Sequence, residues 1–205
     1  MKIAITGGIG SGKSYVCKLL AARGIEIYDC DAAAKRLMRT SASLRQQLTD
    51  LIGADTYLPD GRLNKAVVAK FLLASEANAH AIDAIVHPAV AQDFEQSGAQ
   101  WMECAILYES GFDRLVDRVI VVTAPEEVRL NRIMARDGIT REKAREWMGR
   151  QWPQAEVLSR ADYEIVNDGQ ASLEQQISGI LRSLAHDNVR TINRLNEKPT
   201  PRLID

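Results

Sequence analysis

The sequence predicts an α/β domain in which a parallel five-stranded sheet is covered by helices. Three observations support this: short apolar segments alternate with amphipathic ones, polar residues follow the segments with strand character, and a glycine-rich turn joins the first predicted strand to the first predicted helix. Parallel strands end at one edge of a sheet, so the polar residues that follow them are expected to meet there.

The predicted strands cover residues 2–6, 25–29, 103–108, 118–123 and 163–166. A helix is predicted over residues 14–23, and Gly24 suits the left-handed position that ends a helix. With the two strands that flank it, this helix forms a βαβ unit.

Two stretches carry helical patterns without intervening strands. The first, with a turn signal at Pro59-Asp60-Gly61, predicts a helical insert at the carboxyl edge of the sheet. The second is rich in arginine and predicts a helical lid. The resulting division is a nucleotide-binding core of residues 1–31 and 99–185, an insert of residues 32–98, a lid of about residues 126–151, and a flexible tail of residues 186–205.

Composition narrows the possible partners and the compartment. The formal net charge of the 205 residues is -1, which gives no general attraction to nucleic acid or to an anionic membrane. The apolar run that ends at Gly7 is too brief for a signal peptide, and no segment reaches the roughly 20 apolar residues of a spanning helix. We therefore expect a cytoplasmic protein whose oligomeric state the sequence leaves open. Cys17, Cys30 and Cys104 are odd in number and lack CxxC spacing, so we expect reduced core thiols.

The strongest motif is the complete G-x-x-x-x-G-K-S sequence that runs from Gly7 to Ser14, between a predicted strand and a predicted helix. Glycines allow backbone N–H groups to surround a polyphosphate, and the helix N-terminus adds partial positive charge. Lys13 is expected to reach the β- and γ-phosphates, and the Ser14 hydroxyl is expected to ligate Mg²⁺. The motif predicts a P-loop protein that binds ATP with Mg²⁺.

The motif alone does not name the reaction. A GTPase needs Asn-Lys-x-Asp, whereas Asn64-Lys65 continues as Ala66-Val67 inside the insert. A mechanical ATPase carries an acidic residue after a long apolar strand, and Glu109 after Ile106-Leu107-Tyr108 leaves that alternative open.

Asp29 and Asp31 follow the second predicted strand, on the same edge of the sheet as the phosphate loop. Two carboxylates two residues apart on extended backbone point to one side, where one is able to accept a proton from a hydroxyl group and the other to organise Mg²⁺ through water. The alternative is that Asp31 caps the helix that follows it.

The arginines of the lid share helical faces at spacings of three, four and seven residues, as Arg129, Arg132 and Arg136 do. Arginines on such a face often only contact solvent and have no role in binding. A kinase, however, must shield the transferring phosphoryl group from water, and a lid that carries arginines does so while neutralising charge. We expect at least one of Arg132, Arg136 and Arg141 to contact phosphate.

On these residues the chain resembles the dephospho-coenzyme A kinase family over about residues 1–185. The resemblance rests on the run from Ile5 to Ser14 and on Asp29-Cys30-Asp31. Further matches are Asp60-Gly61-x-Leu63, His87-Pro88, Glu109, Arg132, Arg136-Asp137, Thr140-Arg141-Glu142 and the segment from Ala161 to Asn167.

The resemblance implies an ATP-dependent kinase that phosphorylates the ribose 3′-hydroxyl of dephospho-coenzyme A, the final step of coenzyme A synthesis. It implies catalytic roles for Asp31, Lys13, Arg136 and Arg141. It implies nucleotide contacts from Gly8, Ile9, Gly10, Ser11, Gly12, Lys13, Ser14, Tyr15 and Asn167, and acceptor contacts from Asp29, Asp31, His87 and Glu109.

Three alternatives stay open at this point. The proline after His87 disfavours helix, so His87-Pro88 is expected to break the insert and the imidazole is either a substrate contact or an exposed group at a helix boundary. A second alternative is that the chain is a different small-metabolite P-loop kinase, such as a shikimate-like or nucleoside-like kinase. A third reading is a regulatory protein that hydrolyses ATP slowly and holds a partner with its insert.

Overall fold

The computed structural model describes the backbone of residues 1–196 and the side chains up to residue 187. Its sheet confirms the predicted α/β class, with five parallel strands in the order β2-β3-β1-β4-β5. The strands are β1 (Ile3–Thr6), β2 (Ile27–Asp29), β3 (Trp101–Glu103), β4 (Arg118–Thr123) and β5 (Tyr163–Val166).

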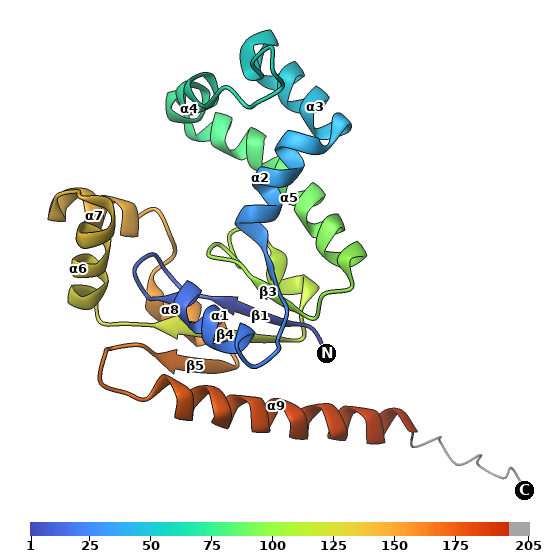
Figure 1. The fold of residues 1–205 in the computed structure, drawn as a ribbon, viewed down its shortest axis with the longest axis vertical. Helices are drawn as coiled ribbons and strands as arrows, with labels where there is room; N and C mark the ends of the chain where they lie inside the picture. Colours follow the sequence, from blue (N-terminus) through green and yellow to red (C-terminus); the bar gives the residue numbers. More distant parts are fainter. Residues whose placement is uncertain (197–205) are drawn as a thin grey trace, which may run out of the picture.

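The helices fall into three groups around this sheet (Figure 1). The insert contains α2 (Cys30–Thr40), α3 (Ala42–Ile52), α4 (Lys65–Ala74) and α5 (Glu76–Ser97), with the short turn η1 (Ala54–Thr56). The second group comprises α6 (Glu126–Asp137) and α7 (Arg141–Met148), whereas α8 (Gln154–Arg160) lies against the sheet at β4. The remaining elements are α1 (Lys13–Ala21), η2 (Phe112–Leu115) and α9 (Leu173–Asn196).

Alternation along the strands explains why the sheet needs helices on both faces. Ile3 and Ile5 of β1 pack in one cluster with residues of α1 and α9, whereas Ala4 packs in a second cluster with residues of α5. Both faces of β1 are buried, as expected for a central parallel strand. Figure 1 shows α9 along one side of the sheet and the insert helices rising from the opposite side.

The third strand is shorter than predicted and lies earlier in the chain, over Trp101–Glu103. We expected a strand over residues 103–108, but β3 ends at Glu103 and the chain then turns, with Ser110 N–H donating to Ile106 C=O and Phe112 N–H to Leu107 C=O. Leu107 is fully buried beneath this turn. The apolar residues of a buried turn therefore produced a pattern that resembles a strand.

The predicted break at His87-Pro88 is wrong, because α5 runs through Pro88 from Glu76 to Ser97. Proline removes one N–H donor from the helical ladder, but buried contacts from Ile82, Val86, Val90 and Phe94 hold the helix on both sides of it.

The end of the chain also differs from expectation. We predicted a flexible tail from residue 186, yet α9 continues to Asn196. Residues 197–205, the remainder of that predicted tail, lie outside the described residues. Within the described part of the chain, no helix combines the length and the apolar character needed to cross a membrane.

Candidate active site

The loop between β1 and α1 has a backbone that only glycine permits at two points. Gly10 and Gly12 have φ angles of 81° and 88°, in the left-handed region. A Cβ on Gly12 would lie 2.1 Å from Nδ2 of Asn167, and one on Gly10 would lie 2.7 Å from the carbonyl oxygen of Arg129. The glycine pattern of the motif therefore has a local physical cause.

Three side chains from distant elements hold the carbonyl groups of this loop. Arg129 Nε donates to Ile9 O at 2.9 Å, Asn167 Nδ2 to Ser11 O at 2.8 Å, and Arg132 Nη1 to Ser11 O at 3.2 Å. Arg129 is buried, and burial lowers the pKa of its guanidinium below the usual value. The amides of Ile9 and Ser11 donate to Gln151 Oε1 and Gly8 O, and with these carbonyl groups occupied the other amides of the loop are available to an anion.

A cavity of about 470 Å³ lies over the loop. Its lining includes most of the residues expected to bind nucleotide: Gly8, Ile9, Gly10, Gly12, Lys13 and Ser14. Ser11 is instead fully buried, and Tyr15, which is 55% exposed, is not part of the lining. Asn167 contacts the loop itself, where it also accepts from Arg132 Nη2 at 3.3 Å.

Glu103 is a site residue that sequence reasoning missed. Its Oε1 atom forms an ion pair with Lys13 Nζ and accepts from Ser14 Oγ at 3.3 Å. In the sheet register Glu103 lies beside both Ile5 of β1 and Asp29 of β2, at the shared carboxyl edge. The signal that would have found it is an acidic residue that ends a short apolar segment. The predicted strand began two residues too late and placed Glu103 at its start instead of its end.

Glu109, which we had placed at that strand end, lies elsewhere. Its Oε1 atom accepts from the backbone N–H of Trp152 at 3.1 Å. It lines neither the loop cavity nor the second large cavity described below.

The two aspartates have different environments. Asp29 is the N-cap of α2, because its side chain accepts from Ala32 N–H at 2.9 Å. Asp31 lies in the first turn of that helix and forms an exposed ion pair with Lys35. The alternative in which Asp31 is the cap is therefore wrong, and so is the expectation that both carboxylates lie on extended backbone, because β2 ends at Asp29.

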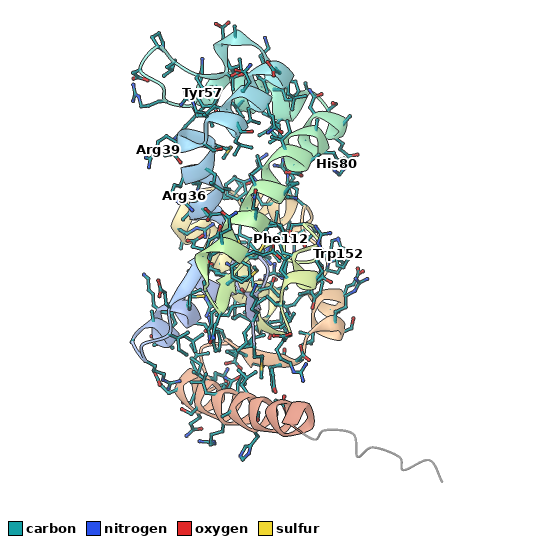
Figure 2. The ribbon with its side chains drawn as sticks, turned by 90° about the vertical axis from the view of Figure 1, so that its right-hand side faces the viewer. Arg36, Arg39, Tyr57, His80, Phe112 and Trp152 are labelled. Atoms are coloured by element: carbon teal, nitrogen blue, oxygen red, sulfur yellow. The ribbon has the colours of Figure 1, made fainter. Side chains whose placement is uncertain are left out.

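A second cavity, of about 440 Å³, lies between the insert and the turn that follows β3. Apolar side chains such as Met38, Leu72 and Val86 dominate its lining, together with Asp31, Asp83 and His87. His87 lies edge-on to Phe112, with ring centroids 5.7 Å apart, and its Nε2 is 3.5 Å from Asp83 Oδ1. Figure 2 shows Phe112 at the level where the insert meets the sheet, well below Tyr57 and His80.

The two cavities meet at Ala105, which lines both. The structure thus brings the phosphate loop and Asp31 to adjoining spaces.

The arginines of α6 and α7 differ in their position relative to the cavity over the phosphate loop. Arg132 and Arg136 line the cavity over the phosphate loop, whereas Arg141 does not. Arg136 pairs with Asp137 at 2.7 Å, and this hydrogen bond holds the pKa of the Asp137 carboxyl below its usual range. Arg141 forms an ion pair with Glu127 that links α7 to α6 and likewise lowers the pKa of Glu127.

Oxygen atoms suitable for a magnesium ion are present at the loop. Ser14 Oγ and Glu103 Oε1 lie 3.3 Å apart, and hydroxyl and carboxylate oxygens are the ligands that Mg²⁺ prefers. The described residues contain no group of three His, Cys, Asp or Glu side chains that would form a metal cage. This donor set fits an ion that is shared with substrate phosphates and that keeps several waters.

The family model and the sequence relatives that match this chain agree on one family. The family model described as dephospho-CoA kinase matches residues 1–173. A dephospho-CoA kinase of Bacteroides fragilis is 38% identical over 191 residues, covering 90% of this chain and 93% of the relative. A dephospho-CoA kinase of Porphyromonas gingivalis is 39% identical over 189 residues, with 89% and 93% covered.

Solved structures share the fold. A crystal structure of a Thermus thermophilus protein superposes with a TM-score of 0.75 at 31% identity, covering 91% of this chain and 97% of that one. A dephospho-CoA kinase from Campylobacter jejuni superposes with a TM-score of 0.64 at 20% identity, covering 92% and 100%, which supports the fold alone.

Proposed function

Because the chain belongs to the dephospho-CoA kinase family, we propose that it transfers the γ-phosphoryl group of ATP to the ribose 3′-hydroxyl of dephospho-coenzyme A, giving ADP and coenzyme A. The observation that carries this proposal is the pair of adjoining cavities. One lies over a complete phosphate loop, the other is largely apolar with the carboxylates of Asp31 and Asp83 in its lining, and Ala105 belongs to both.

The nucleotide binds in the first cavity, with its phosphates over the amide groups of the loop. Lys13 leaves Glu103 and contacts the β- and γ-phosphates, whose combined negative charge exceeds that of one carboxylate. Asn167 and Arg132 hold the shape of the loop through their hydrogen bonds to Ser11 O.

Bound with the nucleotide, Mg²⁺ neutralises charge on the phosphates. Ser14 Oγ and Glu103 Oε1 are the protein atoms that would hold it, directly or through water.

The acceptor binds in the second cavity, where the apolar lining suits the adenine and pantetheine portions of a long substrate. Asp31 accepts the proton of the attacking hydroxyl as its oxygen approaches phosphorus. Its side chain is 76% exposed and pairs with the exposed Lys35, so it is able to turn toward a bound ribose. His87 contributes a polar contact from α5.

Helices α6 and α7 act as the lid over the nucleotide. Arg136 already faces the cavity, and Arg141 reaches it when the lid closes. In this proposal residues 32–98, within the insert whose first helix begins at Cys30, bind the acceptor, and the sheet with the phosphate loop binds the nucleotide. The cytoplasm is the proposed location, since three buried free cysteines suit a reducing compartment.

Purified protein tests this proposal in an ADP-release assay with Mg²⁺-ATP and a panel of acceptors: dephospho-coenzyme A, shikimate, a nucleoside, and buffer alone. We expect ADP release above the buffer rate only with dephospho-coenzyme A. An equal rate with buffer would favour the ATP-hydrolysing regulator, and a higher rate with another acceptor would favour a different metabolite kinase.

A further inference from the structure

Gln151 lies where the two cavities meet. It follows α7, lines the cavity over the phosphate loop, and contacts Ala105, the residue that belongs to both cavities. Gln151 itself does not line the second cavity, so it approaches the junction from the side of the phosphate loop.

The orientation of the Gln151 carboxamide is fixed by its partners. The backbone N–H of Ile9 donates to Oε1 at 2.7 Å, and because an N–H group requires an acceptor, this atom is the oxygen. Nε2 is then the atom that faces Ala105 C=O, at 3.4 Å. That contact is long and uses one of the two hydrogens on Nε2, so the other is available to a ligand.

The residue after Gln151 is anchored independently of the nucleotide site. Trp152 N–H donates to Glu109 Oε1 at 3.1 Å, and the Trp152 ring stacks on Tyr108 with centroids 5.9 Å apart and planes inclined by 10°. This anchoring restricts the position of Gln151 and reduces the entropy lost when its side chain binds a ligand. Glu109, expected to touch the acceptor, thus supports a residue at the junction.

We propose that Gln151 Nε2 donates a hydrogen bond to the terminal phosphoryl group of the nucleotide while Oε1 keeps the Ile9 amide. The inference rests on the proposed function and adds a residue to its nucleotide site. A neutral donor fixed where negative charge moves between two sites stabilises that charge without reorganising.

Two substitutions separate this role from a structural one. Gln151→Glu keeps an acceptor for Ile9 N–H but replaces the donor with a negative oxygen, whereas Gln151→Ala removes both. Gln154→Ala is the matched control, because Gln154 Oε1 accepts from the Ala124 backbone N–H at 3.2 Å and the residue is not part of the nucleotide-cavity lining. For each variant we would measure turnover and the Kd of Mg²⁺-ADP and of a non-hydrolysable imido analogue of ATP.

Gln151→Glu is expected to weaken binding of the ATP analogue at least about tenfold more than binding of ADP, and to lower turnover roughly 100-fold. Gln151→Ala is expected to have effects between those of Gln151→Glu and wild type. Gln154→Ala should leave both unchanged. The proposal is overturned if Gln151→Glu behaves as wild type, or if it weakens ADP and the analogue by the same factor. Because the Kd ratio needs no acceptor, this failure is distinct from a failure of wild-type protein to phosphorylate dephospho-coenzyme A.

Discussion

Asp29 and Asp31 are close in sequence, but their proposed roles require different chemical properties of the side chain. Asp29 accepts from Ala32 N–H, which asparagine would do almost equally well, whereas the proposed base at Asp31 must take up a proton, which an amide does not do. We therefore predict that Asp31→Asn lowers turnover roughly 100-fold or more, with a melting temperature within a few degrees of wild type. Kinetics with saturating ATP and a thermal melt check this.

Asp29→Asn is the matched control for that variant and should keep both the cap and most of the turnover, because its amide oxygen still accepts from Ala32 N–H. If Asp29→Asn were inactive and Asp31→Asn fully active, the base would be Asp29 and the assignment would be off by two residues.

Lys13 lines the cavity over the phosphate loop and forms an ion pair with Glu103. Lys13→Ala should nearly abolish turnover and leave the fold intact, because α1 needs only the backbone of this residue. Retention of more than about a tenth of the wild-type rate, a barrier change under about 1.4 kcal/mol, would count against the phosphate-loop assignment.

Glu103→Gln removes a negative charge beside the expected phosphates and a proposed magnesium ligand. We predict a higher Mg²⁺ concentration for half-maximal rate, together with tighter binding of ATP in the presence of EDTA, because repulsion between Glu103 and the phosphates is gone. Titrations of Mg²⁺ and of free ATP measure the two effects. An unchanged Mg²⁺ requirement would show that Glu103 serves only to hold Lys13.

At the scale of elements, α6 and α7 form a body with its own small core of Leu130, Ile133 and Ala144. Its ion pairs are exposed, so breaking Arg141–Glu127 costs little stability. We predict that Arg136→Ala and Arg141→Ala lower kcat more than they raise the acceptor KM, because these charges meet phosphate on closure. Lys143→Ala, which breaks the exposed pair with Glu146 on the same helix, is the control.

Steady-state kinetics against dephospho-coenzyme A separates the two possibilities for these arginines. A rise in the acceptor KM with kcat unchanged would place them in acceptor binding and would end the lid interpretation.

Element types could be predicted where the local pattern is unambiguous. β4 and β5 have the predicted bounds, and the loop before α1 follows from its glycines and its flanks. Errors arose where burial and secondary structure diverge. Leu107 is buried in a turn, and Pro88 lies inside a helix that tertiary contacts hold together.

At the scale of the whole molecule, the residues that were not predicted are those brought to the site by contacts between segments far apart in the sequence. Glu103 is 90 residues from Lys13, Arg129 is 120 residues from Ile9, and Gln151 is 142 residues from Ile9. A contiguous motif such as the phosphate loop is visible in the sequence, whereas these partners depend on the order β2-β3-β1-β4-β5 and on where the chain returns to it.

That same topology joins the two cavities. The insert leaves the sheet after β2 and returns at β3, so its apolar cavity opens beside the strand edge that carries the phosphate loop. This arrangement supports the proposal that the nucleotide and the acceptor bind in adjoining cavities.

The most direct test of this account is the identity of the product formed from Mg²⁺-ATP and dephospho-coenzyme A. Mass spectrometry and phosphorus NMR should show ADP and coenzyme A in equal amounts, with the new phosphate on the ribose 3′-oxygen. A phosphate at another position, or ADP without a phosphorylated acceptor, would contradict the assignment of the two cavities.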